Sequence, residues 1–463
     1  MPTVDRTNDM DKDVTLGLYF KSHRRFRDIP HNSFFHLLDF YDLLLFMIQN
    51  IKGMPDLLPA ETSRWQFVEK KLHNILAAYA YQEIRTPILE ETALFVRSVG
   101  EHTDIVGKEM FTFTDQGEVQ MTLRPEGTAS VMRAYLQHHI EKQTSFSKLY
   151  YMGPMFRRER PQKGRLRQFH QLGVEAIGKR DPWVDIEIIA LLMHICESFE
   201  LPDIRLEINS LGDSETRKNY RDVLQKYFHK HASILSEGEK ARLEKNPLRL
   251  LDSKNPDLAK IIAEAPSILE HLTDESKEYF DQVQQGLRDS KIPFHINPRI
   301  VRGLDYYSHT AFEVMISGLG SQNTVGAGGR YDKLSTELGE KEIPAIGFAL
   351  GIDRLILCIE EKLKIQNQKR IEVISLDEKT RAAAFVIAQD LRKSFEDHTI
   401  DMQFDVKSLK AALRLADKNN AAYAIILGEN EWKEKKATIK NLSSSEQANV
   451  AFADVVKYLK EKS

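Results

Sequence analysis

Residues 151–178 read YMGPMFRRERPQKGRLRQFHQLGVEAIG, two strand-like runs joined by a polar loop that is rich in arginine. Side chains two positions apart in a strand point to the same face of a sheet. The residues expected to line one face of this hairpin are Arg157, Glu159, Phe169, Gln171, Gly173 and Glu175. A sheet interior does not tolerate so many unpaired charges, so this face is either a solvated surface or the floor of a site for a polar ligand.

The sequence before this hairpin predicts a helix and a second, shorter hairpin. Apolar and aromatic residues recur at helical spacing from Trp65 to Tyr79, after an N-cap that Thr62 or Ser63 offers. Residues 110–125 alternate as two strands around a glycine-containing turn. A helix that leads into paired strands is typical of a domain that mixes both kinds of element.

The whole chain predicts several domains, because 463 residues are too many for one core. Residues 47–212 and 291–365 combine strands and helices and are expected to form the first core. Residues 213–290 lose the strand pattern and predict a helical insertion. Residues 369–463 alternate strand and helix, which is typical of a separate α/β domain.

The first fifty residues contain an apolar run, from Phe34 to Ile48, that is too short to span a bilayer and carries Asp39 and Asp42. It starts too late for a secretory signal and lacks a small-residue cleavage pattern. The segment is either an amphipathic docking element or an extension upstream of a true translation start at Met47. We favour the second interpretation.

Composition limits the class of protein. The content of 42% hydrophobic and 29% charged residues, with a net charge of −3, is that of an ordinary globular protein. This charge excludes a globally basic nucleic-acid coat but not a local basic surface. The two cysteines, Cys196 and Cys358, lie in apolar runs without metal-ligand spacing, so buried reduced thiols and a reducing compartment are expected.

Two other segments carry residues suited to small polar ligands. RGLDYYSHTAFE, residues 302–313, places Arg302 close to Tyr306 and Tyr307. Arginine binds carboxylate or phosphate oxygens through a planar fork, and tyrosine supplies an aromatic wall with a polar tip. A turn with half-buried tyrosines is the structural alternative.

TLRPEGT, residues 122–128, places Glu126 and Thr128 in a turn where an acid and a hydroxyl could hold an ammonium group. Ordinary turn chemistry is the structural alternative for this segment.

Two segments nearer the C-terminus bear on anion binding. GAGGRYD, residues 326–332, lacks the Lys-Ser/Thr ending of a P-loop, so it predicts close backbone packing against a ligand or a neighbouring strand. Arg354 opens a helix whose free N–H groups and positive potential attract an anion.

From Ile51 to the C-terminus, these segments taken in order resemble the histidyl-tRNA synthetases, a family of class II aminoacyl-tRNA synthetases. IKGMPDLLP resembles the N-terminal signature of the family, and TPILEETALF resembles motif 1, which builds the dimer interface. Residues 151–178 are similar to motif 2, and AIGFALGIDRL is similar to motif 3. RGLDYYSHTAFE and GAGGRYD are similar to the histidine-specific signatures. The resemblance implies an α+β catalytic core built on an antiparallel sheet, with a helical insertion and a C-terminal α/β anticodon-binding domain.

The resemblance also implies an ATP-dependent ligase that converts L-histidine to histidyl-adenylate and transfers it to the 3′ end of tRNA(His). The catalytic residues would be Arg157, which bridges the ATP α-phosphate and the histidine carboxylate, and Arg302, which sits against that phosphate. The implied histidine-binding residues are Glu126, Gly127, Thr128, Arg157, Gln171, Glu175, Arg302, Tyr306, Tyr307 and Tyr331. The implied ATP-binding residues are Arg157, Glu159, Arg165, Phe169 and Arg354.

Further implications concern partners. Mg²⁺ would accompany the leaving pyrophosphate, with no dedicated protein metal site. The loop from Pro161 to Arg167 would approach the tRNA acceptor end, the helical insertion would close over the acceptor arm, and the protein would act as a cytoplasmic homodimer without a membrane span.

Two other classes of protein remain as alternatives. One is the regulatory subunit of ATP phosphoribosyltransferase, but that branch typically lacks the anticodon domain and the ATP-binding arginines. The other is a histidine or uncharged-tRNA sensor, which would usually carry signalling domains.

Overall fold

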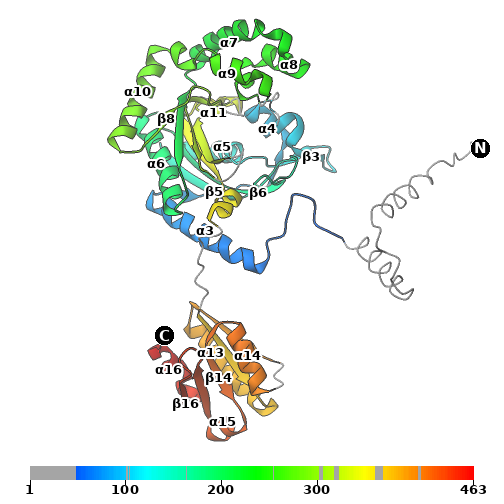
Figure 1. Ribbon diagram of the computed structural model, residues 1–463, viewed down its shortest axis with the longest axis vertical. Helices are drawn as coiled ribbons and strands as arrows, with labels where there is room; N and C mark the ends of the chain where they lie inside the picture. Colours follow the sequence, from blue (N-terminus) through cyan, green and yellow to red (C-terminus); the bar gives the residue numbers. More distant parts are fainter. Residues whose placement is uncertain are drawn as a thin grey trace, which may run out of the picture. The chain divides into compact units, whose positions relative to one another are not determined.

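The computed structural model describes residues 48–100, 103, 105–162, 164–253, 255–301, 306–317, 323–359, 369–404 and 408–462. The chain divides into two compact units, Met1–Glu361 and Lys362–Ser463 (Figure 1). Each unit has its own sheet and hydrophobic core. Our expectations for residues 1–46 and for a start at Met47 lie outside the described residues.

The first unit is built on an eight-stranded sheet with the order β1-β5-β6-β11-β10-β9-β7-β8. Its strands are β1 (Gln82–Glu83), β5 (Ser147–Phe156), β6 (Gln168–Ile177), β7 (Arg205–Ser210), β8 (His295–Ile296), β9 (Ser308–Met315), β10 (Thr324–Arg330) and β11 (Ala345–Gly351). The strands from β5 to β7 in this order pair antiparallel, and the two edge strands add parallel pairs. The expectation of an antiparallel core is confirmed.

The hairpin predicted from residues 151–178 is formed by β5 and β6. Their register places Tyr151 opposite Gly173 and Met155 opposite Phe169. β5 ends at Phe156, so Arg157 lies beyond the ladder, where its N–H donates to the carbonyl of Arg167 at 2.9 Å.

A small three-stranded sheet precedes the main hairpin. It has the order β2-β4-β3, with β2 at Leu89–Glu91, β3 at Phe111–Thr114 and β4 at Gln120–Leu123. The antiparallel pairing of β3 with β4 confirms the shorter hairpin. Helices α4 (Thr92–Val99) and α5 (Thr128–Gln137) follow β2 and β4 in the chain.

Helix α3 (Pro59–Ala78) buries most of the predicted apolar stripe: Trp65, Val68, Leu72, Ile75 and Leu76. Tyr79, the last residue of that stripe, is the C-cap of the helix and is only half-buried. The predicted N-cap is wrong. Thr62 and Ser63 lie inside the first turn, where both hydroxyls donate to the carbonyl of Pro59. The helix starts earlier because Pro59 already has the φ that a first helical residue needs, and the Glu61 carboxylate accepts from the N–H of Leu58.

The remaining helices of the first unit are α6 (Pro182–Ser198), α7 (Ser214–His229), α8 (Glu237–Lys245), α9 (Ala259–Glu264), α10 (Asp274–Asp289), α11 (Leu334–Glu337) and α12 (Ile352–Ile359). The segment expected to be helical holds α7 to α10, and α7, α8 and α9 gather at the end of the unit opposite α3 (Figure 1). Helix α10 packs on α6, where a Cβ on Gly286 would lie 2.2 Å from Ile186 Cδ1. No helix in the described ranges has both the length and the apolar character needed to cross a bilayer.

The second unit has a five-stranded sheet with the order β13-β12-β14-β15-β16. Its elements are β12 (Lys369–Ser375), α13 (Arg381–Ser394), β13 (His398–Gln403), α14 (Leu409–Lys418), β14 (Ala421–Leu427), α15 (Glu429–Glu434), β15 (Lys436–Asn441), β16 (Gln447–Ala451) and α16 (Val455–Lys462). The alternation of strand and helix is confirmed, but α15 and β16 were not predicted. Helix α15 is short and polar, and β16 has only five residues, so neither carries a strong hydrophobic period.

Candidate active site

A cavity of about 310 Å³ lies over β6, β10 and β11 of the first unit. The structure brings most of the predicted residues to its wall: Glu126, Thr128, Arg157, Glu159, Arg165, Phe169, Gln171, Glu175, Tyr306, Tyr307, Tyr331 and Arg354. Gly127 is not part of the wall. Arg302 lies outside the described residues.

One end of the cavity contains Glu126, which is fixed at the N-terminus of α5. Its carboxylate accepts hydrogen bonds from the N–H groups of Thr128 (2.8 Å) and Ala129 (2.9 Å). Burial raises the pKa of this carboxyl, and the two backbone donors oppose that rise. Glu126 is therefore a buried acid that the first two N–H groups of α5 hold in one orientation.

Glu175, on β6, is the second buried acid at this end. One oxygen accepts from the Thr128 hydroxyl at 2.8 Å, and the other accepts from the Tyr331 hydroxyl at 2.5 Å. Burial raises the pKa of Glu175 to about 8, and these two donors oppose the rise. Two acids so close together favour a ligand that brings positive charge or N–H donors.

Tyrosine rings form the wall beside these acids. Tyr306 lies 4.9 Å from Tyr307 and 5.8 Å from Tyr331, measured between ring centroids. The Tyr306 hydroxyl and Gln171 Oε1 are buried, and neither has a hydrogen-bond partner in the described part of the chain. An unsatisfied buried polar group costs roughly 1–3 kcal/mol, so both atoms indicate a polar ligand in this part of the cavity.

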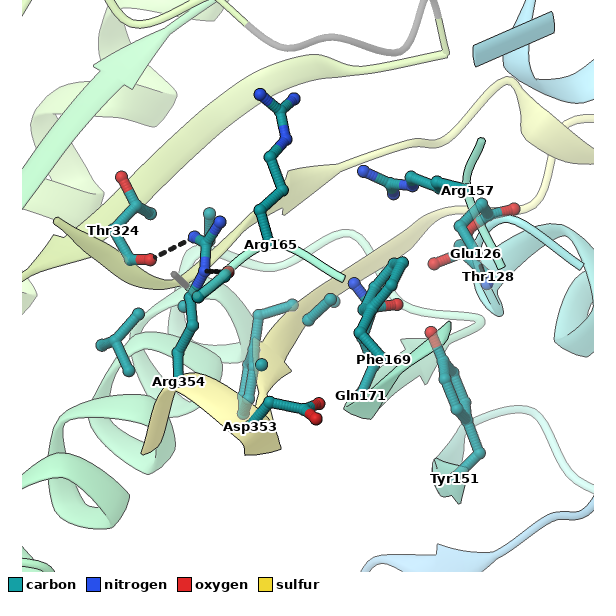
Figure 2. A pocket seen from close by; sticks show the side chains of 18 of the residues that line it. Glu126, Thr128, Tyr151, Arg157, Arg165, Phe169, Gln171, Thr324, Asp353 and Arg354 are labelled. Atoms are coloured by element: carbon teal, nitrogen blue, oxygen red, sulfur yellow. Dashed lines mark hydrogen bonds between the residues drawn. The ribbon is translucent and has the colours of Figure 1, made fainter. Parts of the chain in front are cut away.

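The other end of the cavity is positively charged. Figure 2 shows Arg165 and Arg354 on one side of Phe169, with Glu126, Thr128 and Tyr151 on the other side. Arg354 donates to the carbonyls of Gly164 (3.0 Å) and Thr324 (2.8 Å). Burial lowers the pKa of the Arg354 guanidinium, and the nearby cations lower it further.

Arg165 forms an ion pair with Glu159, so these two predicted residues hold each other in place. An arriving anion would compete with Glu159 for the Arg165 guanidinium.

Arg157 lies between the two ends of the cavity. Its guanidinium carbon is 5.3 Å from the centroid of the Phe169 ring, and its Nε donates to the carbonyl of Pro125 at 3.0 Å. Burial lowers the pKa of Arg157. Arginine nevertheless keeps its charge in proteins, so the site holds a fixed cation where its two ends meet.

Sequence reasoning missed Tyr151, whose ring fills the space between two glycines. A Cβ on Gly127 would lie 2.2 Å from this ring, and a Cβ on Gly173 would lie 2.0 Å from it. Gly127 thus acts through the packing of Tyr151 and not as part of the wall. Tyr151 pairs with Gly173 across the hairpin, so an exact strand register would have placed its ring beside the predicted site.

Gly347 and Asp353 were also missed, and both line the cavity. A Cβ on Gly347 would lie 2.0 Å from Glu175 Oε2, so β11 can pass this acid only with glycine there. Asp353 accepts from the N–H of His170 at 2.5 Å and so ties the start of α12 to β6. Asp353 could have been found from its position directly before the predicted Arg354. No feature of the sequence around Gly347 indicated that this glycine lies against Glu175.

The arrangement suits a ligand, or a pair of ligands, with positive charge or N–H donors at one end and negative charge at the other. Buried carboxylates and tyrosines suit an ammonium group and ring N–H donors. The arginine end suits phosphate oxygens, and the exposed part of the Phe169 ring suits a flat base. A carboxylate held near Arg157 would lie where these two parts meet.

Comparison with known proteins gives consistent likenesses over both units. Residues 53–355 match the family described as "Histidyl-tRNA synthetase", and residues 370–462 match "Anticodon binding domain". The histidine–tRNA ligase of Halothermothrix orenii is 45% identical over 413 residues, which cover 89% of this chain and 98% of that protein. The histidine–tRNA ligase of Crocosphaera subtropica is 46% identical over 410 residues, which cover 88% and 94%. The crystal structure of apo S. aureus histidyl-tRNA synthetase has a TM-score of 0.76 and 36% sequence identity, and the match covers 89% of this chain and 100% of that one.

Proposed function

The chain belongs to the histidyl-tRNA synthetase family, and we propose that it activates L-histidine with ATP and transfers the histidyl group to the 3′ end of tRNA(His). The observation that carries the proposal is that one cavity has buried acids and tyrosines at one end and three arginines toward the other. Histidine offers an ammonium group, ring N–H donors and a carboxylate, and ATP offers phosphates and a flat base. The cavity has a matching group for each of them.

We assign histidine recognition to the acidic end. Glu126 and the Thr128 hydroxyl would hold the α-ammonium group together with Gln171, whose buried Oε1 needs a donor. Glu175 would accept a ring N–H of the imidazole, with Tyr306 and Tyr331 around the ring and Tyr307 behind them. Binding the amino acid would then give hydrogen-bond partners to the buried Tyr306 hydroxyl and Gln171 Oε1.

We assign adenylate formation to the arginines. The histidine carboxylate would attack the α-phosphorus in line, forming a new P–O bond while the bond to the departing pyrophosphate breaks. Arg157 would contact both the attacking carboxylate and the α-phosphate, and it stabilises charge that develops there. Arg165 and Arg354 would hold the outer phosphates, with the adenine on Phe169 and Glu159 at its edge. Arg302 keeps its proposed place against the α-phosphate on the resemblance alone.

Mg²⁺ is proposed to enter with the nucleotide and to neutralise charge on the departing pyrophosphate when it is bound. In the described ranges, no three His, Cys, Asp or Glu side chains cluster closely enough to hold a metal ion.

Several partner assignments rest on family membership. We propose a homodimer formed through the motif 1 segment, tRNA contact by the loop from Pro161 to Arg167, closure of the insertion (residues 213–290) over the acceptor arm, and anticodon recognition by residues 369–463. We also propose that the enzyme works in the cytoplasm.

Exchange of labelled pyrophosphate into ATP tests the activation step without tRNA. We expect exchange only when L-histidine is present, because the two acids and the tyrosines select an amino acid with ring N–H donors. The other proteinogenic amino acids, tested singly, serve as controls. Exchange that is equal with several amino acids, or absent with histidine, would refute the proposed function.

Removing the second unit after Glu361 should separate the two steps of the reaction. We expect pyrophosphate exchange to stay within about threefold of the intact enzyme, because the first unit has its own sheet and contains the whole cavity. Charging of tRNA(His) should fall by roughly 100-fold or more, since much of the tRNA contact is lost. Equal losses in the two assays would contradict the assignment of the second unit to tRNA binding.

A further inference from the structure

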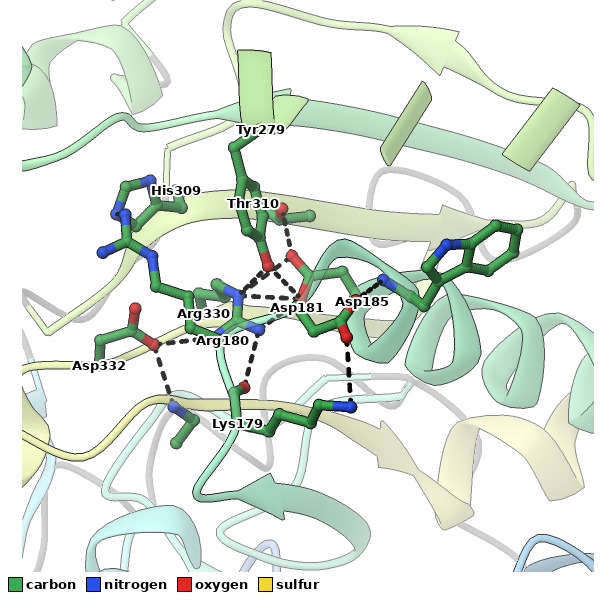
Figure 3. Close-up of polar contacts among 11 residues, drawn as sticks. Lys179, Arg180, Asp181, Asp185, Tyr279, His309, Thr310, Arg330 and Asp332 are labelled. Carbon is green, nitrogen blue, oxygen red and sulfur yellow. Dashed lines mark hydrogen bonds and ion pairs between the residues drawn. The ribbon is translucent and has the colours of Figure 1, made fainter. Parts of the chain in front are cut away.

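One buried cation of the catalytic core lies outside the proposed chemistry. Arg330, at the end of β10, is fully buried and does not line the cavity. Its guanidinium donates to Asp185 (2.9 Å from Nε), to Asp332 (3.0 Å from Nη1) and to the carbonyl of Lys179 (3.2 Å from Nη2). A second ion-pair contact, from Nη2 to Asp185, measures 2.8 Å. Figure 3 shows Arg330 surrounded by these partners.

Asp185, on α6, links three elements through its two oxygens. It pairs with Arg330 of β10, accepts from the Thr310 hydroxyl of β9 at 2.6 Å, and accepts from the Tyr279 hydroxyl of α10 at 3.1 Å. The Tyr279 hydroxyl in turn lies 2.9 Å from Arg330 Nε. A single buried carboxylate therefore fixes the relative positions of β9, β10 and α10.

The pairing of β9 with β10 is irregular at this point. Gly329 pairs with Ala311, but the next residue, Arg330, pairs with Ser308, so two residues of β9 are left over. One of them is His309, which has a φ of +46°, and the other is Thr310. Bulges redirect the chain and its side chains. Here the redirected chain is the one that carries Tyr306 and Tyr307, and Thr310 fastens the bulge to Asp185.

The third tyrosine of the wall follows Arg330 directly. Tyr331 lies beyond the end of β10, and its N–H donates to the carbonyl of Ala345 at 2.9 Å. The N–H of Ala345 donates to the Asp332 carboxylate, which also receives Arg330. The residues on both sides of Tyr331 are thus held by buried ionic contacts.

We propose that Asp185 and Arg330 are positioning residues for the tyrosine wall, and that together they set the affinity of the cavity for histidine. This proposal rests on the proposed function. The pair touches neither substrate. It holds the bulge of β9, and Tyr306 and Tyr307 lie just before that bulge in the chain. It also holds the end of β10, and Tyr331 follows that end directly. The helical segment contributes to the same contact through Tyr279.

The ionic character of the pair is what makes it a strong constraint. Both side chains are inaccessible to solvent, so a mispaired charge cannot be hydrated. Removing the charge of Asp185 leaves the buried Arg330 guanidinium with the Asp332 carboxylate but without its ionic contact to α6, and this loss drives a local rearrangement. That rearrangement would displace the tyrosines of the cavity wall, and also Glu175, which accepts a hydrogen bond from Tyr331.

Asp185→Asn tests the proposal because asparagine keeps the size of the side chain and removes its charge. We expect the KM for histidine in pyrophosphate exchange to rise about tenfold, a change worth about 1.4 kcal/mol. The KM for ATP should stay within about twofold, since the arginines that bind phosphate lie outside this contact.

The matched control is Ile186→Ala, at the next position of α6 and in contact with Gly286 of α10. It should lower the melting temperature by roughly 5 °C or more through lost packing, while both KM values stay unchanged.

Three results separate the possible failures. If the wild-type enzyme shows no histidine-dependent exchange, the proposed function fails. If the wild type is active and Asp185→Asn loses stability with an unchanged KM for histidine, as the control does, the pair is only structural and the positioning proposal is overturned. If Asp185→Asn does not fold, Thr310→Val decides, because it removes only the β9 link; an unchanged KM for histidine there also overturns the proposal, and a rise of about threefold or more supports it.

Discussion

Arg157→Ala should lower kcat/KM for histidine-dependent pyrophosphate exchange by about 1000-fold or more. Removing one donor aimed at developing charge commonly costs a factor of about 100 to 1000. We expect a larger loss because Arg157 lies between the two ends of the cavity and would contact both reactants. The same loss is expected for Arg302→Ala on the resemblance.

Arg158→Ala provides the control for this prediction. Arg158 is the next residue in the chain, is exposed, and does not line the cavity. Its replacement should leave exchange within about twofold. Arg157→Lys should recover only part of the rate, because an ammonium group lacks the planar fork that can engage two substrates. If Arg157→Ala keeps more than about a tenth of the activity, the proposed role is wrong.

Glu175→Gln should greatly weaken recognition of histidine and, at the same time, stabilise the protein at alkaline pH relative to wild type. The loss of recognition follows from removing the acceptor that Tyr331 and Thr128 hold in place for the imidazole. We expect the KM for histidine to rise about 100-fold or more, as when a site built to hydrogen-bond a substrate group loses its partner for that group.

The stability effect follows from the direction of the pKa shift. Burial raises the pKa of Glu175 from 4.5 to about 8, so between these values the folded protein binds a proton that the unfolded chain releases. The stability contribution of this group therefore falls as pH rises from about 4.5 to 8, and it changes little above that range. Glutamine does not titrate, so its stability contribution does not fall with pH. The melting temperature of the variant minus that of wild type should therefore be larger at pH 8 than at pH 5.

Glu207→Gln is the matched control for this second prediction. Glu207 is a buried acid on the same sheet, bonded to Asn297 and paired with Arg205, and it lies outside the cavity wall. Its replacement should leave the KM for histidine unchanged. A Glu175→Gln enzyme with normal histidine KM would contradict the assigned role, and a melting difference that does not grow with pH would contradict the pH argument.

The sequence determined the local elements wherever a strong hydrophobic period was present. The hairpin at residues 151–178, the apolar stripe from Trp65 and the alternation after residue 369 all follow from short-range patterns that the final fold satisfies. Weak or polar periods did not suffice, which is why α15 and β16 were missed. The start of α3 was also misplaced, because the proline at its first position outweighed the hydroxyl residues after it.

The sequence also indicated the polar residues of the site, because charged residues in a strand pattern are costly to bury without a partner. The resemblance to a known family then predicted their roles. Of the residues named in this way, Arg302 lies outside the described part of the chain, and Gly127 contacts Tyr151 without joining the cavity wall.

Only the tertiary structure decided which residues meet. Residues 126, 175 and 331 are distant in sequence. They join one hydrogen-bonded group because Thr128, at the start of α5, bonds both acids and because β6, β11 and β10 are neighbours in the sheet. Whether a glycine is required depends on what approaches it, as Glu175 approaches Gly347. The buried pair of Asp185 and Arg330 has the same origin: nothing local in either segment requires the other, and the link exists only because a helix crosses two strands where their pairing shifts.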